Sequence, residues 1–116
     1  MEQAALDQIR RRLDGDRVHL MAQLADMGVD PDTGNPNGDQ FDQGFADSGQ
    51  STAEKALVLS MAEGVLENVK EIDAALERIA GGTYGSCESC GQPIGDERLD
   101  ARPVARLCVT CKRRAG

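Results

Sequence analysis

The chain has 116 residues, which is enough for one domain or for a small domain with an appendage, but not for two large cores. Only 3% of the residues are aromatic, so the rings that usually dominate a core are scarce and a further source of stability is needed. A net charge of −7 argues against unaided binding to the nucleic-acid backbone or to an acidic membrane surface.

No run of residues approaches the roughly 18 to 20 apolar positions that a membrane span needs. The first residues, Met1-Glu2-Gln3, lack the basic start and apolar run of a signal peptide, so we expect a cytoplasmic protein without membrane contact. Thiols stay reduced in that compartment, so the four cysteines of the last quarter of the chain are not expected to form disulfides.

Charge divides the chain near Gly81-Gly82. Acidic residues outnumber basic ones 16 to 7 over residues 1–80, whereas basic residues outnumber acidic ones 6 to 4 over residues 81–116. This difference predicts two domains with a boundary at that glycine pair.

Two segments of the first domain have the apolar spacing of helices. In the first, the spacing alternates between three and four, and Gly28 is the expected stop; the apolar positions are Leu6, Ile9, Leu13, Leu20, Leu24 and Met27. The second, residues 53–80, opens on a capping box, Ser51 to Glu54, and repeats its apolar positions every seven residues; these are Val58, Ala62, Val65, Val69, Ile72, Leu76 and Ile79.

A heptad repeat of this length requires a partner helix, and a helix over 53–80 would be about 42 Å long. We therefore predict a mainly α fold, in which residues 1–80 form an antiparallel two-helix coiled-coil hairpin. A compact helical bundle is the alternative, but no third long helix is available to close it.

The segment between the helices, about residues 28–51, would form the tip of the hairpin. It is rich in Gly, Pro, Asn and Asp and has no Lys or Arg. An EF-hand does not fit, because its first and last ligand positions fall on Thr33 and Gly44. The alternative is a solvated acidic linker. Phe41 and Phe45 weigh against that alternative, because two of the three aromatic residues of the chain lie in this segment and look like anchors for a contact.

The strongest motif lies in residues 81–116. Cys87-x-x-Cys90 and Cys108-x-x-Cys111 are separated by seventeen residues, which is the spacing of a four-thiolate zinc site. Four thiolates fill the tetrahedral sphere, so the spacing predicts one structural zinc ion whose binding is coupled to folding of this module. A redox dithiol and an iron–sulfur cluster are the alternatives.

A catalytic constellation is not visible, because His19 is the only histidine and no cysteine is left over. We therefore expect a protein that is not an enzyme.

Residues 82–111 resemble the DksA/TraR (DnaK suppressor) zinc-finger family of bacterial transcription regulators. The run that carries this resemblance is Gly82-Thr-Tyr84-Gly-x-Cys87-Glu-x-Cys90-Gly91-x-Pro-Ile94-Gly-x-x-Arg98-Leu99-x-Ala101-Arg102-Pro103-x-Ala105-x-Leu-Cys108-x-x-Cys111.

The resemblance implies a monomeric protein that binds RNA polymerase directly and inserts its coiled-coil tip through the secondary channel, without sequence-specific contacts to DNA. Family tips carry two aspartates three residues apart, followed by a small residue. These positions fall on Gly44, Asp47 and Gly49, so only Asp47 of the acidic pair is retained, and Asp42 is a candidate replacement for the first aspartate.

Some relatives help to form a site for guanosine tetraphosphate. The two helix positions of that site fall here on Gly64 and Glu71, while Arg102 and Lys112 of the finger are retained. A carboxylate repels a polyphosphate, so this chain is expected to lack the alarmone as a partner. Arg98, Arg102 and Lys112 remain candidate contacts to the polymerase or to an anion.

Two other functions stay open. The first is a zinc-ribbon adaptor that docks on another protein and uses its acidic loop as a tether. The second is a zinc-dependent DNA-binding protein that uses Arg98, Arg102, Arg106 and the basic run at Lys112.

Overall fold

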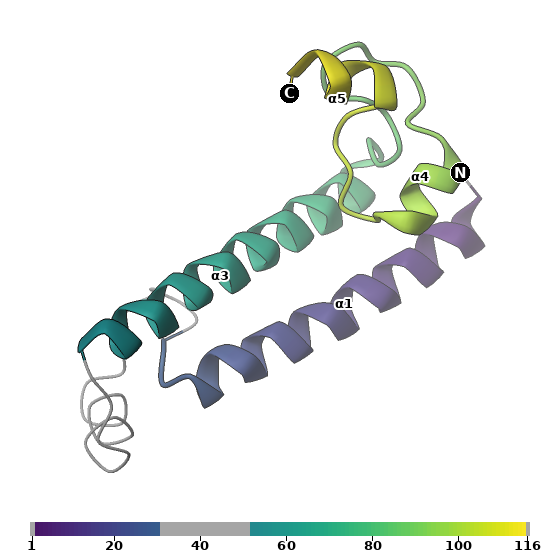
Figure 1. Cartoon of the computed structure of the whole chain (residues 1–116). Helices are drawn as coiled ribbons and strands as arrows, with labels where there is room; N and C mark the ends of the chain where they lie inside the picture. The colour runs from purple at the N-terminus through teal and green to yellow at the C-terminus, as the bar shows by residue number, and fades with distance from the viewer. Residues whose placement is uncertain (1, 31–51, 116) are drawn as a thin grey trace. The chain divides into compact units, whose positions relative to one another are not determined.

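The computed structural model describes residues 2–30 and 52–115, and within these ranges all regular elements are helices (Figure 1). The helices are α1 (Gln3–Asp26), α3 (Thr52–Gly81), α4 (Asp96–Ala101) and α5 (Val109–Ala115). The described residues contain no strand, and an isolated antiparallel bridge links Ser86 and Pro93. The predicted class, a mainly α protein with a helical hairpin and a four-cysteine finger, is confirmed.

The two long helices bury the apolar positions that the sequence predicts. Leu13 and Leu24 of α1 are fully buried, and the other members of its stripe are half-buried. All seven heptad positions of α3 are buried or half-buried, and Ala75 joins them. Helix α3 begins one residue after Ser51, as the capping box predicts, although Ser51 itself lies outside the described residues.

The contacts divide the chain into two compact units, and both long helices contribute to each. Unit 1 comprises Met1–Gly15 and Glu71–Gly116, and unit 2 comprises Asp16–Lys70. The first part of α1 is thus grouped with the last part of α3, and the last part of α1 with the first part of α3, which is the pairing of an antiparallel hairpin. The division at residues 80 and 81 is based on charge and stays a prediction.

In unit 2 the end of α1 is fixed by a Schellman motif. Gly28 has φ +74° and donates to the Ala25 carbonyl at 3.0 Å, and Val29 donates to the Leu24 carbonyl, also at 3.0 Å. Leu24 and Val29 are fully buried and pack with Ala62 of α3. The predicted stop at Gly28 is confirmed, and its hydrophobic contact forms the core of this unit.

In unit 1 the helices and the finger bury apolar residues of their own. Leu13, Ile72 and Ala75 are the buried helix residues. The finger contributes Tyr84, Ile94, Leu99 and Ala105. Val104 and Leu107 of the finger are half-buried.

Six residues predicted for the tip lie outside the described residues, namely Phe41, Asp42, Gly44, Phe45, Asp47 and Gly49. None of the helices in the described ranges combines the length and the apolar character that a membrane span requires.

Candidate metal centre and its basic pocket

The first cysteine pair lies on a tight turn. Gly91 donates to the Cys87 carbonyl at 2.9 Å, and Cys87 donates to the Gln92 carbonyl at 2.8 Å. Gly91 adopts φ +76°, a left-handed conformation that favours glycine. This local geometry places the sulfurs of Cys87 and Cys90 on one turn, as the sequence predicts.

The second pair lies at the start of α5. Cys108 directly precedes the helix and Cys111 lies in its first turn, where Lys112 donates to the Cys108 carbonyl at 2.9 Å. A spacing of three residues along a helical turn brings two side chains to the same face.

Two hydrogen bonds hold the segment that enters the second pair. The Glu88 amide, inside the first pair, donates to the Arg106 carbonyl at 2.9 Å. Arg98 Nε of α4 donates to the Leu107 carbonyl, also at 2.9 Å. The segment that enters the second pair is therefore held beside the first pair by a backbone bond and beside α4 by a side chain.

The four Sγ atoms form one cluster, all within 4.8 Å of one another. The Sγ atoms of Cys90 and Cys108 are 3.8 Å apart, far beyond the disulfide bond length. A zinc ion bound to sulfur at about 2.3 Å in tetrahedral geometry sets its ligands about 3.8 Å apart. The donor set and its spacing therefore fit zinc, and all four predicted ligands meet at one point.

Hydrogen bonds within the cluster shift the thiol pKa values. The backbone N–H of Cys108, followed by that of Cys90, stabilises the Cys87 thiolate and lowers its pKa to about 6. The Cys111 amide lowers the pKa of Cys108, whereas hydrogen bonds to the neighbouring sulfurs, Cys108 first, raise the pKa of Cys111 to about 12. Zinc binds the thiolate form, so its binding would release the protons that the other thiols retain.

No residue from Asp100 to Leu107 lies in a strand, and side chains satisfy four of the carbonyl groups of this segment. The donors come from α1, α3, the residues after α3, and α4. Arg12 Nη1 donates to the Asp100 carbonyl at 2.9 Å, Arg78 Nη2 to Val104 at 3.4 Å, the Tyr84 hydroxyl to Pro103 at 2.8 Å, and Arg98 to Leu107. Arg12 of α1 and Arg78 of α3 thus fix this segment of the finger to the two long helices.

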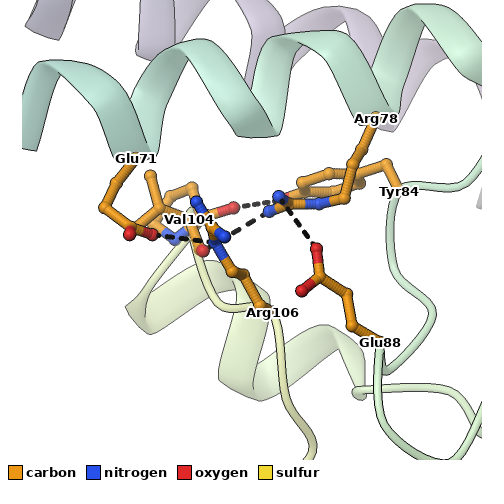
Figure 2. A network of polar contacts seen from close by, with 7 residues as sticks. Glu71, Arg78, Tyr84, Glu88, Val104 and Arg106 are labelled. Atoms are coloured by element: carbon orange, nitrogen blue, oxygen red, sulfur yellow. Dashed lines mark hydrogen bonds and ion pairs between the residues drawn. The ribbon is translucent and has the colours of Figure 1, made fainter.

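Two ion pairs join α3 to the finger (Figure 2). Arg78 Nη1 lies 3.7 Å from Glu88 Oε1, and the Arg78 side chain is only 12% exposed. Seven residues earlier on the same helix, Glu71 Oε2 accepts from Arg106 Nε at 3.2 Å. Residues seven apart share one helix face, so both pairs lie on the side of α3 that the finger covers.

A cavity of about 370 Å³ in unit 1 adjoins these pairs, and we call it the basic pocket. Its charged lining residues are Glu71, Glu88, Arg98, Arg102, Arg106 and Lys112. The three predicted contact residues Arg98, Arg102 and Lys112 therefore line one cavity.

The sequence did not predict the residues that hold the pocket in place. Arg78 and Glu88 were not singled out, and the pairing of Glu71 with Arg106 was not foreseen. Each is an ordinary charged residue in sequence, and only the folded chain brings partners 10 and 35 residues apart into contact.

Fold and site together define a helical hairpin that carries a four-cysteine zinc finger. Residues 82–115 match the family model for the prokaryotic DksA/TraR C4-type zinc finger. The match covers the finger, and the resemblance that the sequence indicated is confirmed there.

Curated relatives match more than half of the chain. The RNA polymerase-binding transcription factor DksA of Caulobacter vibrioides is 41% identical over 70 residues, covering 60% of this chain and 49% of the relative. An uncharacterized protein of Aquifex aeolicus is 43% identical over 67 residues, covering 58% of this chain and 46% of the relative. The match thus spans about half the length of these relatives.

Solved structures match nearly the whole chain. The structure of transcription factor DksA2 from Pseudomonas aeruginosa has a TM-score of 0.76 and 28% identity, and the match covers 99% of this chain and 85% of that one. An RNA polymerase-binding protein from Chlamydia trachomatis is similar in fold, with a TM-score of 0.50, 22% identity, and coverage of 98% and 89%.

Proposed function

We propose that this protein binds RNA polymerase directly and regulates transcription initiation by inserting its coiled-coil tip into the secondary channel. The observation that carries the proposal is the joining of a DksA/TraR-type four-sulfur finger to a helical hairpin, in a fold similar to DksA2 along nearly the whole chain. The relative in Caulobacter vibrioides is named for RNA polymerase binding, which supports the same partner here. The cytoplasmic location expected from the sequence accords with that partner.

In this proposal the finger holds one zinc ion with a structural role. Cys87, Cys90, Cys108 and Cys111 would each supply one thiolate, and four thiolates leave no coordination position for water or substrate. The bound ion would crosslink the two cysteine-bearing turns, which have few apolar residues to hold them together. A site of this kind supports a regulator that is not an enzyme.

The tip would act through Asp47, with Asp42 as the candidate second carboxylate and with Phe41 and Phe45 as anchors. These assignments are based on sequence, because the tip lies outside the described residues. A carboxylate delivered near a polymerase active site would change the electrostatic potential around its metal ions.

We further propose that guanosine tetraphosphate is not a partner at the finger. The pairing of Glu71 with Arg106 supports this view, because one of the four cations of the basic pocket already neutralises an internal carboxylate. Glu88 adds a second negative charge to the lining, so the pocket opposes four cations with two anions. Arg98, Arg102 and Lys112 would instead contact acidic groups of the polymerase.

Pull-down with core RNA polymerase, followed by in vitro transcription with Asp47→Ala, tests the proposal. We expect the wild-type protein to bind the core enzyme and to change the lifetime of promoter complexes. Asp47→Ala should retain binding and lose most of the effect on transcription, because only the tip charge is removed. Absence of any association with the polymerase would reject the proposal.

Crosslinking from position 47 distinguishes insertion from docking elsewhere. A photoreactive residue at that position should label a subunit that borders the secondary channel. Labelling of a non-polymerase protein alone would favour the adaptor. Saturable binding to duplex DNA in a gel shift at near-physiological salt, abolished by Arg98→Ala and Arg102→Ala, would favour the DNA-binding protein.

A further inference from the structure

The residues that attach the finger to α3 lie directly beside the predicted zinc ligands. Glu88 follows Cys87 inside the first cysteine pair, and Arg106 lies two residues before Cys108. Each of them forms an ion pair with a side chain of α3, and Figure 2 shows both pairs on the same side of that helix. Each half of the four-sulfur cluster therefore has its own contact with one helix.

The two contact points on α3 have a fixed separation. Glu71 and Arg78 are seven residues apart, which is nearly two turns and about 10 Å along the axis. The backbone hydrogen bonds of the helix set this distance, and α3 contains no cysteine. The helix thus offers the finger a spacing that does not depend on a metal ion.

Arg78 makes the more extensive of the two contacts. Its carbonyl accepts hydrogen bonds from the amides of Thr83 at 2.9 Å and Tyr84 at 3.2 Å, in the segment that enters the first cysteine pair. Its guanidinium donates to the Val104 carbonyl at 3.4 Å, in the segment that enters the second pair, and lies 3.7 Å from the Glu88 carboxylate. Because its side chain is only 12% exposed, Arg78 is shielded from the solvent screening that weakens surface ion pairs.

A backbone hydrogen bond closes these contacts into a ring. The Glu88 amide donates to the Arg106 carbonyl at 2.9 Å, so the contacts lead from Arg78 through Glu88 and Arg106 back to α3 at Glu71. The ring holds both cysteine turns through protein groups alone. Contacts of this kind reduce the conformational entropy that is lost when four thiolates bind one ion, and they therefore strengthen and prolong binding.

We propose that Arg78 and Glu71 are positioning residues for zinc, which hold the two cysteine turns in the arrangement that binds the ion. Neither is one of the four ligands. Arg78 acts through Glu88 and Val104, and Glu71 acts through Arg106. Helix α3 thereby determines how long the finger retains its ion. This inference rests on the proposed zinc ion and is independent of the polymerase.

The experiment measures the rate at which the full-length, reduced, zinc-loaded chain loses zinc to an excess of a colorimetric chelator. Arg78→Met removes the larger contact. Its matched control, Arg10→Met, removes an exposed ion pair of the same length, 3.7 Å, with Asp7 on α1. Tyr84→Phe is a second control, because it deletes a buried hydrogen bond of the same module and leaves both ion pairs in place.

We expect Arg78→Met to release zinc about tenfold faster than wild type, because loss of an outer contact to a metal site commonly costs about ten- to a hundredfold in affinity. Arg78→Lys, which retains the charge next to Glu88, should be intermediate. Arg10→Met should stay within about twofold of wild type. Tyr84→Phe should have a clearly smaller effect than Arg78→Met, because the Pro103 carbonyl that it leaves without a donor lies five residues before Cys108.

Exchange of charges tests the second ion pair. Glu71→Arg places a second cation beside Arg106 and should speed zinc release about threefold, a smaller effect because Glu71 is 33% exposed and the pair is partly screened. Glu71→Arg combined with Arg106→Glu restores an ion pair of reversed sense and should return the rate to near the wild-type value. Such a recovery would show that the contact itself holds the turns.

The failures are distinguishable. Absence of zinc from the wild-type chain after supply of the metal overturns both the zinc site and this inference. Zinc release that Arg78→Met and Glu71→Arg leave unchanged overturns the inference while the zinc site and the polymerase proposal stand. Equal acceleration by Arg78→Met and Tyr84→Phe attributes the effect to a general loss of stability and overturns the positioning role. Failure of the exchanged pair to recover the rate overturns the role of Glu71.

Discussion

Tyr84 is the residue at which the finger, α3 and the segment before the second cysteine pair meet. Its ring is buried, and its hydroxyl donates to the Pro103 carbonyl at 2.8 Å. Burial is the largest influence on the phenol and raises its pKa, against smaller opposing effects of Arg78 and Arg12. Two effects thus favour the protonated hydroxyl: it places no charge in a buried site, and it donates a hydrogen bond to the Pro103 carbonyl.

The titration of Tyr84 is directly measurable, because the chain has one tyrosine and no tryptophan. We expect absorbance at 295 nm to give a midpoint above the value of about 10 that an unperturbed tyrosine shows in denaturant. A pKa that is raised in the folded state means stability that is fully present below about pH 10 and is lost as pH rises through the native pKa. A native midpoint at or below the denatured one would contradict the burial of the ring.

At the scale of elements, arginine side chains replace the strand pairing that the finger lacks. The described finger has one isolated bridge, and four carbonyls between Asp100 and Leu107 accept hydrogen bonds from side chains of the helices and of Tyr84. Arg78 has the least exposed side chain of these ion-pairing residues, at 12%, and it contacts both Val104 and Glu88.

Arg78→Met should therefore destabilise the zinc-loaded protein by about 1 to 3 kcal/mol, because it leaves a part-buried carbonyl and a carboxylate without their partner. Urea unfolding followed by Tyr84 fluorescence measures the change. Arg10→Met is the matched control: Arg10 pairs with Asp7 on the exposed surface at 3.7 Å, and its loss should cost no more than about 0.5 kcal/mol. Equal effects of the two variants would show that Arg78 does not hold the finger.

The glycines of α3 provide a second prediction at this scale. Gly64→Ala should stabilise the protein by up to about 1 kcal/mol, because alanine is the better helix former and its Cβ meets open space. Gly82→Ala should destabilise it by about 1 to 2 kcal/mol, because Gly82 ends the helix at φ +78°. Chemical unfolding of both variants distinguishes these effects, and a stabilising Gly82→Ala would be incompatible with the left-handed helix stop.

At the scale of the whole molecule, the two units draw stability from different sources. Unit 2 has an apolar core of Leu24, Val29 and Ala62 and no cysteine. Unit 1 contains the four-sulfur cluster and a small set of buried apolar residues. Metal binding should therefore matter for one unit far more than for the other.

Zinc removal from the full-length chain tests this difference. With EDTA and a reductant, amides of residues 84–111 should lose most of their protection in hydrogen exchange, because the metal no longer holds the two turns together. Amides of residues 58–66 should retain theirs, because the Leu24–Val29–Ala62 core contains no ligand. Restoring zinc should restore the protection. Simultaneous loss in both segments would mean that the units unfold as one.

The sequence by itself determined the features that depend on local periodicity and spacing. Heptad positions such as Val69 and Ile72 predicted a buried helix face, Gly28 predicted the end of α1, and two CxxC pairs predicted one metal centre. Each follows from short-range geometry, in which residues three, four or seven apart share a face or a turn.

Only the tertiary structure decided which charged residues become partners. Glu71 and Arg106, Arg78 and Glu88, and Arg12 and the Asp100 carbonyl are ordinary in sequence, and no periodicity links them. Their contacts exist because α1, α3 and the finger pack together around buried apolar residues, and long flexible side chains then find the carboxylates and carbonyls that packing brings within reach. The sequence therefore predicted the zinc ligands, whereas the basic pocket became apparent only in the folded chain.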